Sequence, residues 1–161
     1  MEWIIKSMSS RCAVSGEPFR KGDLVICLIF RENEGKVSRF DVLDRNFGGF
    51  SFPGKLLGQW KKEISFQKND DSDTRQLLAD REDFFFSLFE GDSDEKKDIL
   101  KQIFALLLER KRILRFSRKI SENFVKYVHV RTRREFLIPD KELKPEDLTF
   151  VDNVLEMFSQ V

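Results

Sequence analysis

The sequence predicts an α+β protein with a β-rich N-terminal module followed by a C-terminal lobe of ααβββα order. Three observations predict this class. Apolar runs of strand length fill residues 1–66, apolar residues at helical spacing dominate 74–110, and an alternation of period two returns after residue 113. The polar stretch 67–73 separates the two parts, so we expect domains at 1–66 and 74–161, the second with an antiparallel sheet.

The N-terminal module is predicted to contain a β-hairpin. Residues 24–30 form an apolar, β-branched run that follows turn chemistry at 17–23. The polar loop 31–36 contains a glycine, so residues 37–43 are expected to return as the partner strand. Residues 59–66 alternate like a third, half-buried strand.

Two helices are predicted next, over 74–89 and after Asp92. Gly91 ends the first helix, and Asp92 with Glu95 resembles a capping box in which Asp92 is the N-cap. The second helix should bury the apolar residues that lie at helical spacing. These residues are Ile99, Leu100, Ile103, Phe104 and Leu107.

Three strands and a final helix complete the predicted lobe. The strands lie near 114–120, 124–132 and 136–138, and we expect the rings of Phe116 and Phe124 to be core. The last helix starts at Pro145 with acidic residues in its first turn. Its expected core face is Leu148, Val151, Val154, Leu155 and Phe158.

Composition indicates a cytoplasmic protein with no membrane partner. Hydrophobic residues make up 40% of the 161 residues and charged residues 35%, as in soluble globular proteins. No apolar run reaches the ~18 residues that a membrane span needs, and the N-terminus lacks the pattern of a signal peptide. Two cysteines are too few for a disulfide scaffold, which favours a reducing compartment. Nothing in the sequence indicates an oligomeric state.

Cys12 lies in a segment typical of half a zinc knuckle. A structural zinc site needs four ligands, usually two closely spaced pairs of Cys or His. Cys27 falls inside an apolar run, and the single histidine, His129, belongs to the other predicted domain. We therefore expect no metal and no cofactor.

Several short motifs follow one another along the chain: Trp3, Cys12, Gly16, Phe19, Gly22-Asp23, Arg39-Phe40-Asp41, Phe47 and the segment 105–112. In this order of motifs the chain resembles a set of uncharacterised bacterial proteins that begin with a zinc-ribbon-like segment. In that pattern a Cys-x-x-Cys followed by an aromatic residue comes after Arg-x-Asp, whereas this sequence has Leu43-Asp44-Arg45-Asn46-Phe47 there. The resemblance implies a metal-free, degenerate ribbon, and it implies no function.

The charge distribution supplies the main functional hypothesis. Residues 70–98 contain eleven acidic and four basic side chains, whereas residues 110–134 contain ten basic and one acidic. The basic block favours an acidic protein partner, although the acidic block of the same chain could mask it. A nucleic acid is the alternative, because bases interleaved with Phe116, Phe124 and Tyr127 could neutralise phosphates and stack bases. The candidate binding residues, expected on one face, are Arg115, Lys119, Lys126, Arg131 and Arg133.

No catalytic constellation is visible, so we predict a non-catalytic protein, with a small enzyme of unknown class as a second alternative. One histidine cannot form a triad without a distant nucleophile, and its place on a strand indicates a surface or half-buried residue. Gly48-Gly49 does not open a helix with a lysine, which excludes a phosphate loop. Asp41 and Asp44 could pair with Arg39 or Arg45, and surface ion pairs of this kind are common.

Overall fold

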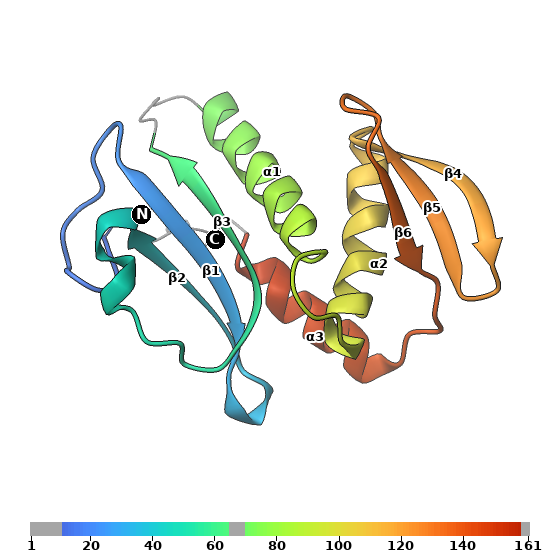
Figure 1. Ribbon diagram of the computed structural model, residues 1–161, viewed down its shortest axis with the longest axis horizontal. Helices are drawn as coiled ribbons and strands as arrows, with labels where there is room; N and C mark the ends of the chain where they lie inside the picture. The colour runs from blue at the N-terminus through green and yellow to red at the C-terminus, as the bar shows by residue number, and fades with distance from the viewer. Residues whose placement is uncertain (1–10, 65–69, 159–161) are drawn as a thin grey trace. The chain divides into compact units, whose positions relative to one another are not determined.

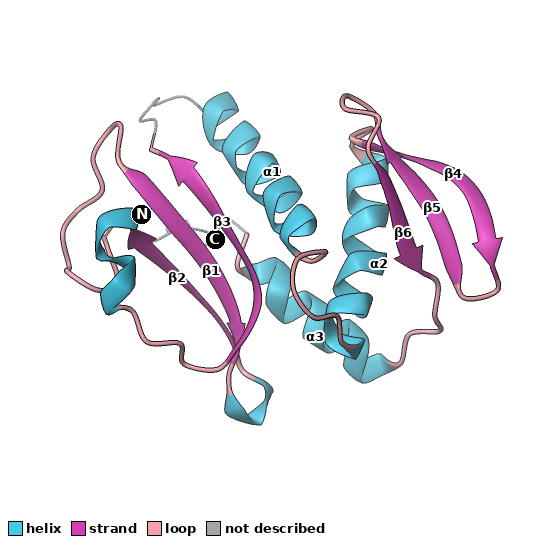
Figure 2. Ribbon diagram, viewed as in Figure 1, coloured by secondary structure: helices cyan, strands magenta, loops and turns pink. Residues whose placement is uncertain are grey.

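The computed structural model describes residues 11–64 and 70–158, with side chains in the first helix from residue 79 onward. Helices combine with two antiparallel three-stranded sheets, which confirms the α+β class (Figures 1 and 2). Within the described residues, no helix combines the length and apolar character that crossing a bilayer requires. In chain order the elements are β1 (Leu24–Arg31), the 3-10 turn η1 (Asn33–Gly35), β2 (Val37–Leu43), the 3-10 turn η2 (Asp44–Gly49), β3 (Lys55–Glu63), α1 (Asp70–Ser87), α2 (Glu95–Arg110), β4 (Leu114–Ser121), β5 (Phe124–His129), β6 (Glu135–Pro139) and α3 (Pro145–Glu156).

The chain divides into two compact units whose boundaries differ from the predicted domains at 1–66 and 74–161. Unit 1 comprises Met1–Ser87 together with Asp152–Val161, and unit 2 comprises Leu88–Val151. The polar stretch 67–73 is therefore not the boundary. Helix α1 belongs to the first unit because it packs on β3, and the end of α3 belongs there because Phe158 stacks on Trp60 of β3.

Unit 1 is built on a sheet of order β2-β1-β3, with the apolar β1 in the centre. The hairpin predicted from residues 24–43 is present, whereas β3 begins at Lys55, earlier than the predicted residue 59. In the register, Cys27 lies between Asp41 and Trp60. These side chains share the face on which α1 packs, because Gly58, two residues before Trp60, lies against Phe84 of α1.

Phenylalanine rings cover the opposite face of this sheet. Phe40 alternates with Arg39 and Asp41 along β2, so its ring points away from α1. Its centroid lies 6.0 Å from that of the fully buried Phe30, which also contacts Phe50 and Phe52 from the loop after η2. The sheet is therefore buried on both faces near Phe30.

Unit 2 packs α2 on a sheet of order β4-β5-β6. Buried side chains of α2, such as Phe104 and Leu108, meet the inward-facing Tyr127 and Phe136 side of the sheet. Burial, followed by the charge of the Glu109 carboxylate of α2, raises the pKa of Tyr127. Figure 1 shows α2 running along one face of the three strands.

Helix α2 differs from the prediction in its cap and its core stripe. Asp94, not Asp92, is the N-cap, because its carboxylate accepts the Lys97 N–H at 2.8 Å. Leu108 is buried, whereas Leu107 and Ile103 are only half-buried. The stripe thus follows i, i+4 spacing through the buried residues Leu100, Phe104 and Leu108.

Three further apolar residues depart from the expected core. In α3, Leu148 is exposed and Phe150 is buried instead. Phe116 and Phe124 were expected to be core rings, but their exposed fractions are 44% and 37%. Both lie on strands of unit 2 at positions that α2 does not cover, because all of β4 beyond Leu114 is exposed.

The close approach of α1 to β3 predicts that Gly58→Ala destabilises the protein. A Cβ at Gly58 would lie 2.5 Å from Ser87 Oγ and 2.6 Å from the Phe84 ring, so the ring or the helix must shift. Overpacking of this kind costs about 1–3 kcal/mol of unfolding free energy. Chemical denaturation should measure that loss, while the control Gly48→Ala, which meets no atom within 4 Å, should be near neutral. Equal midpoints for both variants would contradict this packing.

Candidate functional site

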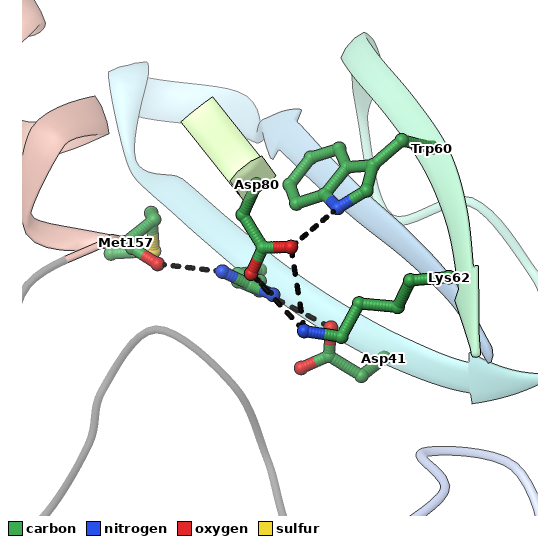
Figure 3. A network of polar contacts seen from close by, with 6 residues as sticks. Asp41, Trp60, Lys62, Asp80 and Met157 are labelled. Carbon is green, nitrogen blue, oxygen red and sulfur yellow. Dashed lines mark hydrogen bonds and ion pairs between the residues drawn. The ribbon is translucent and has the colours of Figure 1, made fainter. Parts of the chain in front are cut away.

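Unit 1 contains a buried network of four charged side chains, shown in Figure 3. Arg39 Nε lies 3.2 Å from Asp41 Oδ1, and Arg39 Nη2 lies 3.6 Å from Asp80 Oδ2. Lys62 Nζ lies 3.2 Å from the same Asp80 oxygen. Two cations thus face two anions, and β2, β3 and α1 each contribute to the network. The ion pair of Arg39 and Asp41, expected at the surface, is buried: the Arg39 side chain is only 3% exposed.

Aromatic rings and the C-terminal segment close this network. Arg39 Nη1 donates a hydrogen bond of 2.9 Å to the Met157 carbonyl, and the guanidinium lies 5.1 Å from the Trp60 ring centroid. Trp60 Nε1 donates to Asp80 Oδ1 at 3.2 Å, and its ring stacks on Phe158. Burial opposes the charge of Arg39, but Asp41 outweighs it, so the pKa of Arg39 is raised. The charged groups of this network pair with one another inside the fold, so the network has a structural role.

Helix α1 adds one carboxyl group with a perturbed pKa beside this network. Burial, and then repulsion by Asp80 and Glu82, raises the pKa of Asp83 to about 6. Asp83 is half-buried and belongs to the same face of α1 as Asp80 within one helical turn. Its ionisation near neutral pH therefore opposes folding of unit 1.

Cys12 occupies a turn in which backbone amides point at its sulfur. The Leu43 N–H donates to Cys12 Sγ at 3.3 Å, and Asn46 Nδ2 lies 3.8 Å from it. Gly16 N–H closes the turn on the Cys12 carbonyl at 2.9 Å, with a φ of +76° that favours glycine. Burial raises the pKa of the thiol, but hydrogen bonds from Ser15, Leu43 and Val14 outweigh it and lower this pKa to about 7.

The turn brings together two loops that the ribbon-like resemblance compares. Leu43 and Asn46 stand where that pattern has its second cysteine pair, and both contact the Cys12 sulfur. Ser15 follows Cys12 at the spacing of a partner ligand, a signal that could have been read from the sequence. Among the side chains that the structure describes, at 11–64 and 79–158, no three His, Cys, Asp or Glu residues are grouped so that they could hold a metal. Cys27 is fully buried in β1, where burial and then Asp41 raise its thiol pKa.

His129 is buried, contrary to the expectation of a surface or half-buried residue. Only 2% of it is exposed, at the end of β5. The Thr132 N–H donates to His129 Nδ1 at 3.2 Å, and the Thr132 hydroxyl lies 2.8 Å from the same nitrogen. Nδ1 is therefore an acceptor, and the imidazole holds the β5–β6 turn in place.

The structure does not bring the five predicted binding residues to one sheet face. Arg115 pairs with Val128 across the ladder, so it shares a face with Lys126, two residues away on β5. Lys119 pairs with Val125 and points to the other face. Arg131 and Arg133 lie in the turn between β5 and β6.

The β5–β6 turn instead adjoins the end of α2. Val130 N–H donates to the Ile113 carbonyl at 2.9 Å, and Leu114 pairs with His129, so the segment after α2 lies beside the turn. Both segments are rich in exposed basic residues, and we name this surface the basic end. Its members are Arg110, Lys111, Arg112, Arg131, Arg133 and Arg134. The first three were counted in the basic block, but sequence spacing did not indicate that they join the turn.

Much of this positive charge is unpaired within unit 2. Lys126 forms an ion pair of 3.3 Å with Glu135, whereas the acidic start of α2 pairs elsewhere, Asp98 with Lys101 and Lys141. Among residues 110–134, seven exposed basic side chains have no carboxylate oxygen of the described side chains within 4.0 Å. They are Arg110, Lys111, Arg112, Arg115, Arg118, Lys119 and Arg133.

Comparison with known proteins gives no family or function for this chain. The sequence matches no protein-family model. The searches of curated proteins and of solved structures likewise find no match.

The hydrogen bonds at Cys12 predict a thiol that titrates near pH 7. Thiolate absorbance near 240 nm should rise with a midpoint of about 7. Cys12→Ser should abolish this transition, and the control Cys27→Ser should retain it, because the pKa of Cys27 is raised well above its ordinary value. A midpoint near the ordinary thiol value in Cys27→Ser would contradict the hydrogen-bonded geometry.

Proposed function

We propose that this protein is a non-catalytic binding protein whose unit 2 binds an acidic segment of a protein partner. The observation that carries the proposal is the set of seven exposed basic side chains at residues 110–134 that have no carboxylate oxygen of the described residues within 4.0 Å. The basic end and the adjoining strand β4 form the proposed binding surface. Arg115 and Arg118 extend the positive charge along one face of β4.

Electrostatics supports a partner of opposite charge. Like charges held together by a fold repel one another, and an acidic partner relieves that repulsion while accelerating encounter. Unit 1 provides the contrast, because there Arg39 and Lys62 each have a carboxylate within 4.0 Å. The cations that unit 1 buries are paired inside the fold, whereas these basic side chains of unit 2 are exposed and lack a described carboxylate within 4.0 Å, which supports a binding role.

The size of the basic surface favours a short acidic peptide over a long polyanion. Helix α2 has 16 residues, so it extends about 24 Å from its acidic start to the basic end. A nucleic acid that continued along unit 2 would meet Glu95 and Asp98 at that start. A short run of Asp and Glu side chains needs only the basic end itself.

Nucleic-acid binding is the second candidate, and two exposed rings favour it. Phe116 and Phe124 lie on strands that also carry Arg115, Arg118 and Lys126, and base stacking on such rings is common in single-strand binders. Phe116, however, also packs edge-to-face on Tyr127 with centroids 5.7 Å apart. Phe124 is the first residue of β5, whereas the basic end adjoins the last residue of that strand.

The positions of the titratable groups support a non-catalytic role. His129 uses Nδ1 to hold the β5–β6 turn, and both cysteines belong to unit 1. The buried network of Arg39 is occupied by its own ion pairs. No pairing of a nucleophile with a general base is evident among the described residues.

Binding of defined acidic probes tests the proposal. A fluorescent Glu-rich peptide should bind at low salt, and raising salt from about 50 to 200 mM should weaken binding. The charge reversals Lys111→Glu and Arg131→Glu together should weaken it about tenfold or more. A matched control, Arg20→Glu with Lys21→Glu in unit 1, reverses two exposed cations that have no carboxylate within 4.0 Å among the side chains that the structure describes. It changes the net charge equally and should have little effect.

The same titration with a single-stranded oligonucleotide of equal charge separates the two candidates. The proposal predicts tighter binding of the peptide. Preference for the oligonucleotide would support the second candidate and contradict the first. If neither probe binds at low salt, both are excluded.

A further inference from the structure

The turn directly after helix α2 contains an arginine in a backbone conformation that favours glycine. Arg112 has a φ of +61°. Its N–H donates to the Glu109 carbonyl, and the Ile113 N–H donates to the Leu108 carbonyl, both at 2.9 Å. This pair of bonds is the Schellman motif, whose left-handed position is normally glycine because a Cβ is strained there.

The β5–β6 turn repeats this feature with a second arginine. Arg133 has a φ of +66°, and its N–H donates to the His129 carbonyl at 2.8 Å. His129 N–H in turn donates to the Arg134 carbonyl at 2.8 Å, so Arg133 is the last residue of a closed turn. Glycine or asparagine would adopt this conformation with less strain.

The two strained arginines lie in adjoining segments. The Val130 to Ile113 hydrogen bond joins the turn to the segment that follows Arg112. Both arginines are exposed, and neither has a carboxylate within 4.0 Å in unit 2. Neither side chain therefore compensates for its backbone strain by an ion pair inside this unit. Strained residues that the fold does not need are typical of functional sites.

We infer that Arg112 and Arg133 are the anchor residues with which the basic end binds carboxylates of the acidic segment; this inference rests on the proposed function. A guanidinium binds a carboxylate through two parallel N–H donors, a geometry that lysine cannot reproduce. The partner chemistry is a run of neighbouring Asp or Glu side chains that engages both guanidinium groups.

Replacement of both arginines by glycine tests the inference, because stability and affinity should move in opposite directions. In the double variant R112G/R133G, the relief of strain should raise Tm by about 2–4 °C or more. Its affinity for the Glu-rich peptide should fall about tenfold or more. The control E34G relieves the third non-glycine positive φ, +69° at Glu34 in unit 1. It should also raise Tm but leave peptide affinity unchanged.

The outcomes distinguish the inference from the function on which it rests. If the parent protein binds the peptide and R112G/R133G binds it equally well, the anchor assignment is wrong and the proposed function stands. If R112G/R133G has a lower Tm than the parent, the strain argument is wrong. If the parent protein fails to bind the peptide, or prefers the oligonucleotide, the proposed function itself fails.

Discussion

The structure of unit 1 depends on the burial of one arginine. A guanidinium that is 3% exposed must be neutralised by near neighbours, because an unpaired charge in a protein interior is strongly unfavourable. Asp41 neutralises it from its own strand, and Asp80 does so from α1. The Met157 carbonyl accepts a hydrogen bond from a third side of the guanidinium. These contacts determine which face of α1 meets the sheet and why the C-terminal segment returns to this unit.

Arg39 and Arg112 show two opposite uses of the same residue type. Arg39 is enclosed by acceptors and by the rings of Trp60 and Phe158, so it stabilises the fold and offers nothing to a ligand. Arg112 is exposed, strained and unpaired within unit 2, so it contributes little to the fold and is open to a partner. This contrast, rather than the total charge of the chain, is the reason for assigning the binding role to unit 2.

Local patterns in the sequence predicted the elements better than their contacts. The β-branched run at 24–30 correctly predicted strand β1, and the apolar stripe correctly predicted helix α2, because periodicity depends on neighbours in sequence. The burial of Arg39 could not be foreseen, since its partner Asp80 lies about forty residues away. The face of each basic side chain was also unpredictable. Two bulges in β4, at 116/118 and 119/121, shift the register on which such a prediction depends.

Mapping the bound peptide onto the protein by NMR tests the central claim most directly. In a titration of ¹⁵N-labelled protein with the Glu-rich peptide, the account predicts that backbone amide shifts concentrate at 110–115 and 130–134. The amides around Arg39 and Asp80, whose charges are enclosed, should change little. Shifts confined to unit 1, or spread evenly over the chain, would contradict the assignment of the binding surface to the basic end of unit 2.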